Sequence, residues 1–125
     1  MKLLDTNIAV DFLRAAPPAI SLLQNLADSD ELVVASELVG FELLAGARSS
    51  ELRVLQQFFA TLIWVPVDAE VARVGGELAW RYRPSLGGIE DVDYLIAATA
   101  LLLEAELLTT SVKHFPMLEG LRPAY

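Results

Sequence analysis

The chain of 125 residues contains no cysteine and a single histidine, His114. Without cysteine it has no disulfide framework and no thiolate nucleophile, and a zinc site of the usual Cys and His ligands is disfavoured. Long apolar runs are also missing, because the longest uncharged one, Tyr94 to Leu103, has about half the length of a membrane-crossing helix. Asp5 interrupts the apolar start before the hydrophobic region of a signal peptide could form. We therefore expect a cytoplasmic protein with no membrane partner.

Basic residues are scarce. Nine lysines and arginines stand against 17 aspartates and glutamates, so the net charge is −8 and the pI is near 4.5. This balance argues against nucleic-acid binding through a broad basic surface. It permits binding of a basic protein segment, and also nucleic-acid binding where metal ions supply the local positive charge. The apolar fraction of 54% argues against disorder and indicates surfaces that a partner covers.

No repeat, low-complexity segment or linker divides the chain, so we predict one domain over residues 1–125. Short apolar segments alternate with segments of helical spacing, which predicts an α/β fold. We expect a central parallel sheet of about four to five short strands with helices on both faces. The expected strands are 3–4, 31–36, 63–67 and 106–111, and the expected helices are 6–15, 17–30, 37–47, 50–62, 69–82 and 92–105.

Three acids occupy positions where a carboxylate is costly. Asp5 follows the first strand, Glu42 is the lone charge in the centre of an apolar helix, and Asp93 opens another helix that is nearly all apolar. Each has a plain structural alternative. Asp5 can cap a helix, Glu42 can pair with Arg48 or Arg53, and Asp93 can interact with the helix dipole.

The expected topology brings these acids together. Functional sites of parallel sheets lie beyond the carboxyl ends of the strands, where Asp5 is expected. The helix from Asp93 runs antiparallel to the last strand, so it begins at the same edge, and the exit of that strand adds Thr110 and Ser111. Converging carboxylates stay ionised when a cation lies between them, and oxygen ligands select Mg²⁺ or Mn²⁺. The residues thus predict metal-dependent phosphoryl transfer or hydrolysis, and leave open whether the enzyme is a nuclease or a phosphatase.

The residues beside these acids are given plainer roles. Asp91 is expected as the N-cap of its helix, with a fourth carboxylate ligand as its alternative, and Glu90 is expected to be solvated. We place His114 in an ordinary loop rather than on a metal.

Three blocks of the sequence resemble PIN domains. "LLDTNIAVDFL" is similar to their opening motif, "ELVGFELLAGA" to the helix with the second acid, and "DVDYLIAATALLLEAELLTTSVKHFP" to their C-terminal block. In length and order the chain is similar to VapC, the toxin of VapBC toxin–antitoxin pairs. The resemblance implies a three-layer α/β/α fold and an endoribonuclease that uses Mg²⁺ or Mn²⁺ and metal-activated water to cleave tRNA or rRNA. It assigns metal binding and catalysis to Asp5, Glu42 and Asp93.

The resemblance also implies partners, namely a second copy in a homodimer and a cognate VapB-type antitoxin in a higher-order complex. The C-terminal segment of the antitoxin would cover the site and insert a basic side chain among the acids. Around the acids we expect polar residues that orient the carboxylates and basic residues that contact the phosphates of the substrate. For the basic residues, a role as solvated surface charges is an equally open alternative. The supporting candidates are Thr6, Asn7, Asp91, Thr110 and Ser111, and the phosphate candidates are Arg14, Arg48 and Lys113.

One turn departs from the family pattern. Where the family often has Asn or Asp after the last strand and a further acid before the Phe, this chain has Ser111 and His114. Ser111 can bond a metal-bound water but adds no charge, so we expect one tightly held ion and weak binding of a second. The departure keeps open a non-catalytic PIN-like protein whose acidic pocket binds a basic partner. A third reading is a phosphatase with Asp5 as nucleophile, although Asn7 stands where such enzymes have a second acid.

Overall fold

Four short parallel strands form the sheet of the computed structural model, which describes all residues from 1 to 125. They are β1 (Lys2–Leu4), β2 (Val33–Ser36), β3 (Ile63–Val65) and β4 (Glu106–Leu108), in the spatial order β3-β2-β1-β4. All three strand pairs are parallel, with Leu3 opposite both Val34 and Leu107. The predicted parallel sheet of about four strands is confirmed.

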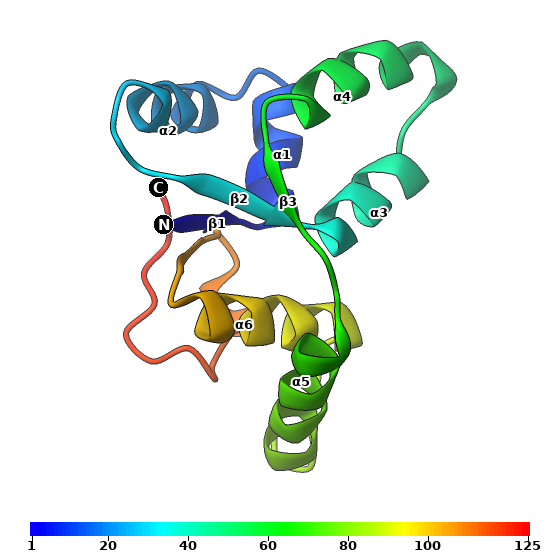
Figure 1. Ribbon diagram of the computed structural model, residues 1–125, viewed down its shortest axis with the longest axis vertical. Helices are drawn as coiled ribbons and strands as arrows, with labels where there is room; N and C mark the ends of the chain where they lie inside the picture. Colours follow the sequence, from blue (N-terminus) through cyan, green and yellow to red (C-terminus); the bar gives the residue numbers. More distant parts are fainter.

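The chain has six helices, and helices lie on both faces of the sheet (Figure 1). Helices α1, α2 and α4 lie on one face, whereas α6 lies on the other and packs along α5, which extends away from the sheet. The three-layer α/β/α architecture is therefore confirmed. The helices are α1 (Thr6–Leu13), α2 (Pro17–Ala27), α3 (Glu37–Ala45), α4 (Leu52–Phe59), α5 (Ala69–Tyr82) and α6 (Asp91–Leu103), with 3₁₀ turns η1 (Ser49–Glu51) and η2 (Val112–His114). None of the helices has the length and apolar character that crossing a membrane requires.

Side-chain caps fix where several helices begin. The hydroxyl of Ser36 accepts a hydrogen bond from the Leu38 N–H at 3.2 Å, and Asp68 Oδ1 accepts one from the Val71 N–H at 2.9 Å. The expectation that Asp91 caps α6 is wrong, because the N-cap is Glu90. The backbone N–H of Glu90 donates to Asp93 Oδ2 at 3.3 Å, as in a capping box, so the acid at the third helical position carries the capping role.

Three of the predicted strands are longer than the observed ones, whereas β1 begins one residue earlier than predicted. β3 ends at Val65 because Pro66 has no N–H to donate to the sheet, and β4 ends at Leu108 rather than at Ser111. The N–H of Asp5 donates to the Leu108 carbonyl at 3.0 Å, which holds the end of β1 beside the end of β4. This edge of the sheet carries the polar residues described next.

Candidate functional site

A cavity of about 460 Å³ opens at the carboxyl edge of the sheet. The starts of α1 and α6, the middle of α3, and η2 supply its walls. The three predicted acids, Asp5, Glu42 and Asp93, therefore share one cavity although they come from distant parts of the chain. Twelve residues line it: Asp5, Thr6, Asn7, Val10, Asp11, Arg14, Glu42, Gly88, Glu90, Asp93, Ser111 and His114.

Asp5 is both a helix cap and a buried carboxylate. It is 8% exposed, and its Oδ1 accepts a hydrogen bond from the Thr6 N–H at 2.9 Å while its Oδ2 accepts one from the Thr109 hydroxyl at 2.7 Å. Burial raises the pKa of the Asp5 carboxyl and the nearby Asp93 carboxylate raises it further, whereas the two hydrogen bonds lower it. No protein cation forms an ion pair with Asp5. Asp5 thus caps α1, as the structural alternative predicted, and its carboxylate has no positively charged partner in the protein.

Thr109 is the residue that sequence reasoning missed. Its buried hydroxyl donates to Asp5 and accepts hydrogen bonds from Asn7 Nδ2 at 3.3 Å and from the Ser111 N–H at 3.0 Å. Asn7 Nδ2 also donates to the Ser111 hydroxyl at 2.9 Å, so Asn7 acts on Asp5 through Thr109 rather than directly. Thr110 contributes only its N–H, 3.4 Å from Asn7 Oδ1. The sequence held no signal for Thr109, because only the observed register, which pairs Leu4 with Leu108, makes the next residues along both strands neighbours.

Glu42 is held by Thr6. The Thr6 hydroxyl donates to Glu42 Oε1 at 2.7 Å, which joins the first turn of α1 to the middle of α3. The alternative of an ion pair with Arg48 or Arg53 is wrong, because neither guanidinium lies within ion-pair distance of the Glu42 carboxylate. The side chain of Thr6 therefore orients Glu42, while its backbone holds Asp5.

Asp93 lies at the cavity wall with two neighbours that the sequence did not predict. Burial raises the pKa of its carboxyl, whereas the hydrogen bond from the Glu90 N–H lowers it. His114 Nδ1 is 3.8 Å from Asp93 Oδ2. Glu90 is exposed, as predicted, although it also lines the cavity, and His114 lines the cavity from the 3₁₀ turn η2.

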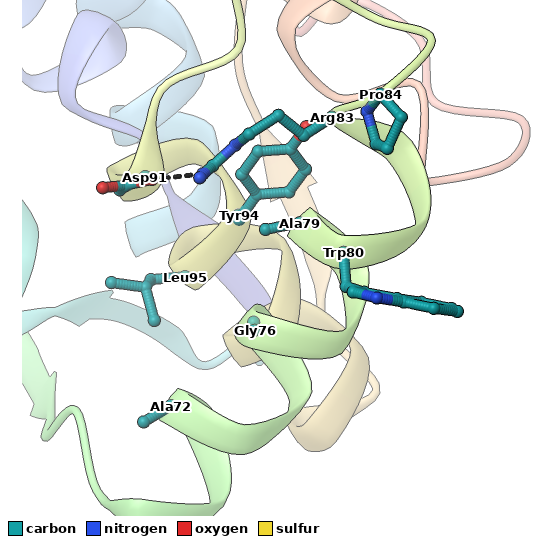
Figure 2. A pocket seen from close by; sticks show the side chains of 10 residues that line it. Ala72, Gly76, Ala79, Trp80, Arg83, Pro84, Asp91, Tyr94 and Leu95 are labelled. Carbon is teal, nitrogen blue, oxygen red and sulfur yellow. Dashed lines mark hydrogen bonds and ion pairs between the residues drawn. The ribbon is translucent and has the colours of Figure 1, made fainter.

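Asp91 points away from this cavity, which we call the acid cavity because Asp5, Glu42 and Asp93 line it. Its carboxylate pairs with Arg83 and its side chain is 82% exposed, beside a second cavity between α5 and α6 (Figure 2). The guanidinium of Arg83 also lies 5.4 Å above the centre of the Tyr94 ring. Among the candidate phosphate contacts, Arg14 lines the acid cavity, whereas Arg48 and Lys113 do not. The structure therefore separates Asp91 from the other predicted acids.

The acid cavity suits a hard cation by the chemistry of its donors. Five carboxylates line it, from Asp5, Asp11, Glu42, Glu90 and Asp93, and Arg14 is the only permanent cation among its residues. As the side chains stand, no three aspartates, glutamates or histidines are close enough together to hold one ion, so binding requires side-chain rotation. Oxygen donors favour Mg²⁺ or Mn²⁺ over softer metals, and a buried carboxylate without a cation gains from such an ion.

Comparison with known proteins agrees with this architecture. The family model described as "PIN domain" matches residues 2–116. Ribonuclease VapC19 from Mycobacterium tuberculosis is 58% identical over 125 residues, with 100% of both chains covered.

Two solved structures have the same fold. One is described as a toxin–antitoxin complex from Klebsiella pneumoniae, and its matching chain has a TM-score of 0.80 and 25% identity over 100% of this chain and 98% of its own. The other is VapBC2 from Rickettsia felis bound to a DNA fragment from their promoter, with a TM-score of 0.80 and 25% identity over 96% and 94% of the two chains. The comparisons of sequence and of fold thus agree, and the chain belongs to the PIN domain family, in its VapC group.

Proposed function

We propose that the protein is a Mg²⁺- or Mn²⁺-dependent endoribonuclease and the toxin of a VapBC-type pair, acting in the cytoplasm on tRNA or rRNA. The convergence of Asp5, Glu42 and Asp93 in one cavity, with no protein cation paired to Asp5 or Glu42, carries this proposal. The full-length relative named a ribonuclease supports the substrate class.

In this mechanism, Asp5, Glu42 and Asp93 would hold the ion, and the surrounding groups orient their carboxylates. Thr109 and the Thr6 N–H hold Asp5, the Thr6 hydroxyl holds Glu42, and the Glu90 N–H holds Asp93. A bound Mg²⁺ or Mn²⁺ would lower the pKa of a coordinated water and offset charge on the scissile phosphate.

Arg14 is the cavity residue suited to position a phosphate, because its guanidinium carries the only permanent positive charge there. Ser111 adds a neutral hydroxyl held by Asn7, so it can bond a water without adding charge to the site.

We propose a VapB-type antitoxin as the protein partner. An apolar groove of about 670 Å³ lies between α1, α2 and α4, and a cavity of about 380 Å³ continues from it toward Arg14 and Glu42. An extended segment in this path would reach the acids, and the net charge of −8 favours a basic one. Exposed Phe41 and Trp80 fit further contacts in a homodimer and a larger complex.

Expression in a bacterial host tests the proposed toxicity. Induction should arrest growth and produce new RNA fragments, and Asp93→Asn should remove both effects. Asp91→Asn is the matched control, because it changes an acid two residues away whose side chain faces the other cavity, and it should remain toxic. Toxicity that persists in Asp93→Asn, or no RNA cleavage in arrested cells, would favour the alternative of a non-catalytic acidic pocket that binds a basic partner.

A further inference from the structure

We propose that His114 is a metal ligand of the acid cavity and that its imidazole gives the site a preference for Mn²⁺ over Mg²⁺. This inference rests on the proposed metal-dependent function. It goes beyond that function because it adds a nitrogen donor to the three carboxylates and predicts which ion the site selects.

The chain after β4 places this imidazole at the cavity. Val112–His114 forms the 3₁₀ turn η2, in which the His114 N–H donates to the Ser111 carbonyl at 2.9 Å. The next residue, Phe115, is 1% exposed and anchors the turn in the core. His114 consequently lines the same cavity as Asp5, Glu42 and Asp93, with its Nδ1 3.8 Å from Asp93 Oδ2.

The ring nitrogens of His114 make no hydrogen bond to the protein, and their one polar neighbour is the carboxylate of Asp93. The distance of 3.8 Å to Asp93 Oδ2 is too long for a hydrogen bond, and the imidazole bonds no other protein group. Its side chain is 41% exposed, against 18% for Asp93, so it can rotate toward the space between the acids. A neutral imidazole presents one nitrogen lone pair, which is therefore free to bind an ion.

The donor chemistry decides which ion gains from this arrangement. Mg²⁺ is a hard ion that prefers oxygen ligands in near-ideal octahedral geometry and gains little from a nitrogen. Imidazole binds first-row transition ions, and Mn²⁺ also accepts the carboxylate oxygens that Asp5, Glu42 and Asp93 provide. A site of three carboxylates and one imidazole should therefore bind Mn²⁺ in preference to Mg²⁺.

Pulsed electron paramagnetic resonance of Mn²⁺ bound to the untagged protein tests this directly. His114 is the only histidine in the chain, so any imidazole nitrogen coupled to the Mn²⁺ electron spin must belong to it. The spectrum of the wild type should show that coupling, and labelling with ¹⁵N-histidine should change it. His114→Gln should remove it, whereas the control Asp91→Asn should keep it.

Calorimetry of the same variants with each metal gives the preference. Loss of the imidazole in His114→Gln should weaken Mn²⁺ binding by about tenfold or more while leaving Mg²⁺ binding nearly unchanged. Bound Mn²⁺ without nitrogen coupling would overturn the inference and leave the proposed metal-dependent function intact. Failure of the wild type to bind either Mn²⁺ or Mg²⁺ would overturn both, and the two failures are therefore distinguishable.

Discussion

The hydroxyl of Thr109 lies 2.7 Å from Asp5 Oδ2, a hydrogen bond between two buried residues that are 104 positions apart in the chain. It joins the exit of β4 to the exit of β1, at the edge where the acids of the site converge. Because no cation pairs with Asp5, this hydroxyl and the Thr6 N–H are the groups that stabilise its charge.

Replacing Thr109 with Val should weaken metal binding without displacing any ligand. The substitution removes the hydroxyl that orients Asp5, and loss of such an orienting group costs about 10- to 100-fold in metal affinity. Calorimetric titration with Mn²⁺ measures the effect. Thr110→Val serves as the control, because only the backbone of Thr110 takes part in the network, and it should bind Mn²⁺ as the wild type does. Equal affinities for both variants would show that Thr109 does not position Asp5.

Thr6 should matter through its hydroxyl. Thr6→Val removes the hydrogen bond to Glu42 and should lower the rate of RNA cleavage by about tenfold or more, whereas Thr6→Ser keeps the hydroxyl and should retain most activity. Single-turnover cleavage at saturating metal compares the two. A serine variant as slow as the valine variant would mean that the methyl group, not the hydrogen bond, holds this part of the site.

The stability of the metal-free protein should depend on pH through Asp5. Burial raises its pKa in the folded state, so the folded protein binds this proton more tightly than the unfolded chain does. The stability that the protonated group contributes is complete below the unfolded pKa, near 3.8, and is lost as the pH rises through the folded pKa. With EDTA present, the wild type should therefore lose more stability than Asp5→Asn as the pH rises from about 4 toward neutrality.

Urea unfolding across this pH range measures that difference. Added Mn²⁺ should stabilise the wild type at pH 7 and leave Asp5→Asn nearly unaffected, because an ion that binds only the folded state shifts the equilibrium toward it. Parallel pH profiles for the two proteins would contradict the raised pKa.

Two adjacent glycines in α5 should respond differently to alanine. A Cβ on Gly75 would lie 2.9 Å from Leu95 Cδ2 of α6, whereas a Cβ on Gly76 would meet nothing within 4 Å. Gly76→Ala should gain about 0.5–1 kcal/mol from helix propensity, and Gly75→Ala should gain less, because its methyl group must displace the end of the Leu95 side chain. Thermal unfolding of both variants checks this, and equal stabilisation would mean that α5 and α6 separate easily.

The sequence predicted the fold and the meeting of the three acids because both depend on periodicity and on the direction of parallel strands. Asp5 and Asp93 had to lie at one edge once β1 and β4 were parallel and α6 preceded β4. Which hydroxyl would face Asp5 could not be predicted the same way. "TTS" reads as a turn, and only the register that pairs Leu4 with Leu108 selects Thr109 over Thr110.

Other features of the site depend on packing between elements. The bond from Thr6 to Glu42 requires α1 and α3 to approach each other at one particular turn, which neither helix encodes alone. The place of His114 depends on the path of η2 after the sheet, and a lone histidine near Phe115 carries no periodic signal. The ion pair between Asp91 and Arg83, which keeps Asp91 out of the acid cavity, likewise depends on how α5 packs on α6.

Cleavage of RNA by the purified protein, free of antitoxin, is the most direct test of the proposed active site. Total RNA would be incubated at low salt with Mg²⁺, Mn²⁺ or EDTA, using the wild type, Asp5→Asn and the control Asp91→Asn. We predict cleavage that needs metal, disappears in Asp5→Asn and persists in Asp91→Asn. Cleavage that survives in Asp5→Asn or in EDTA, or its absence from folded wild type that binds metal, would contradict the assignment of the acid cavity as a metal-dependent ribonuclease site.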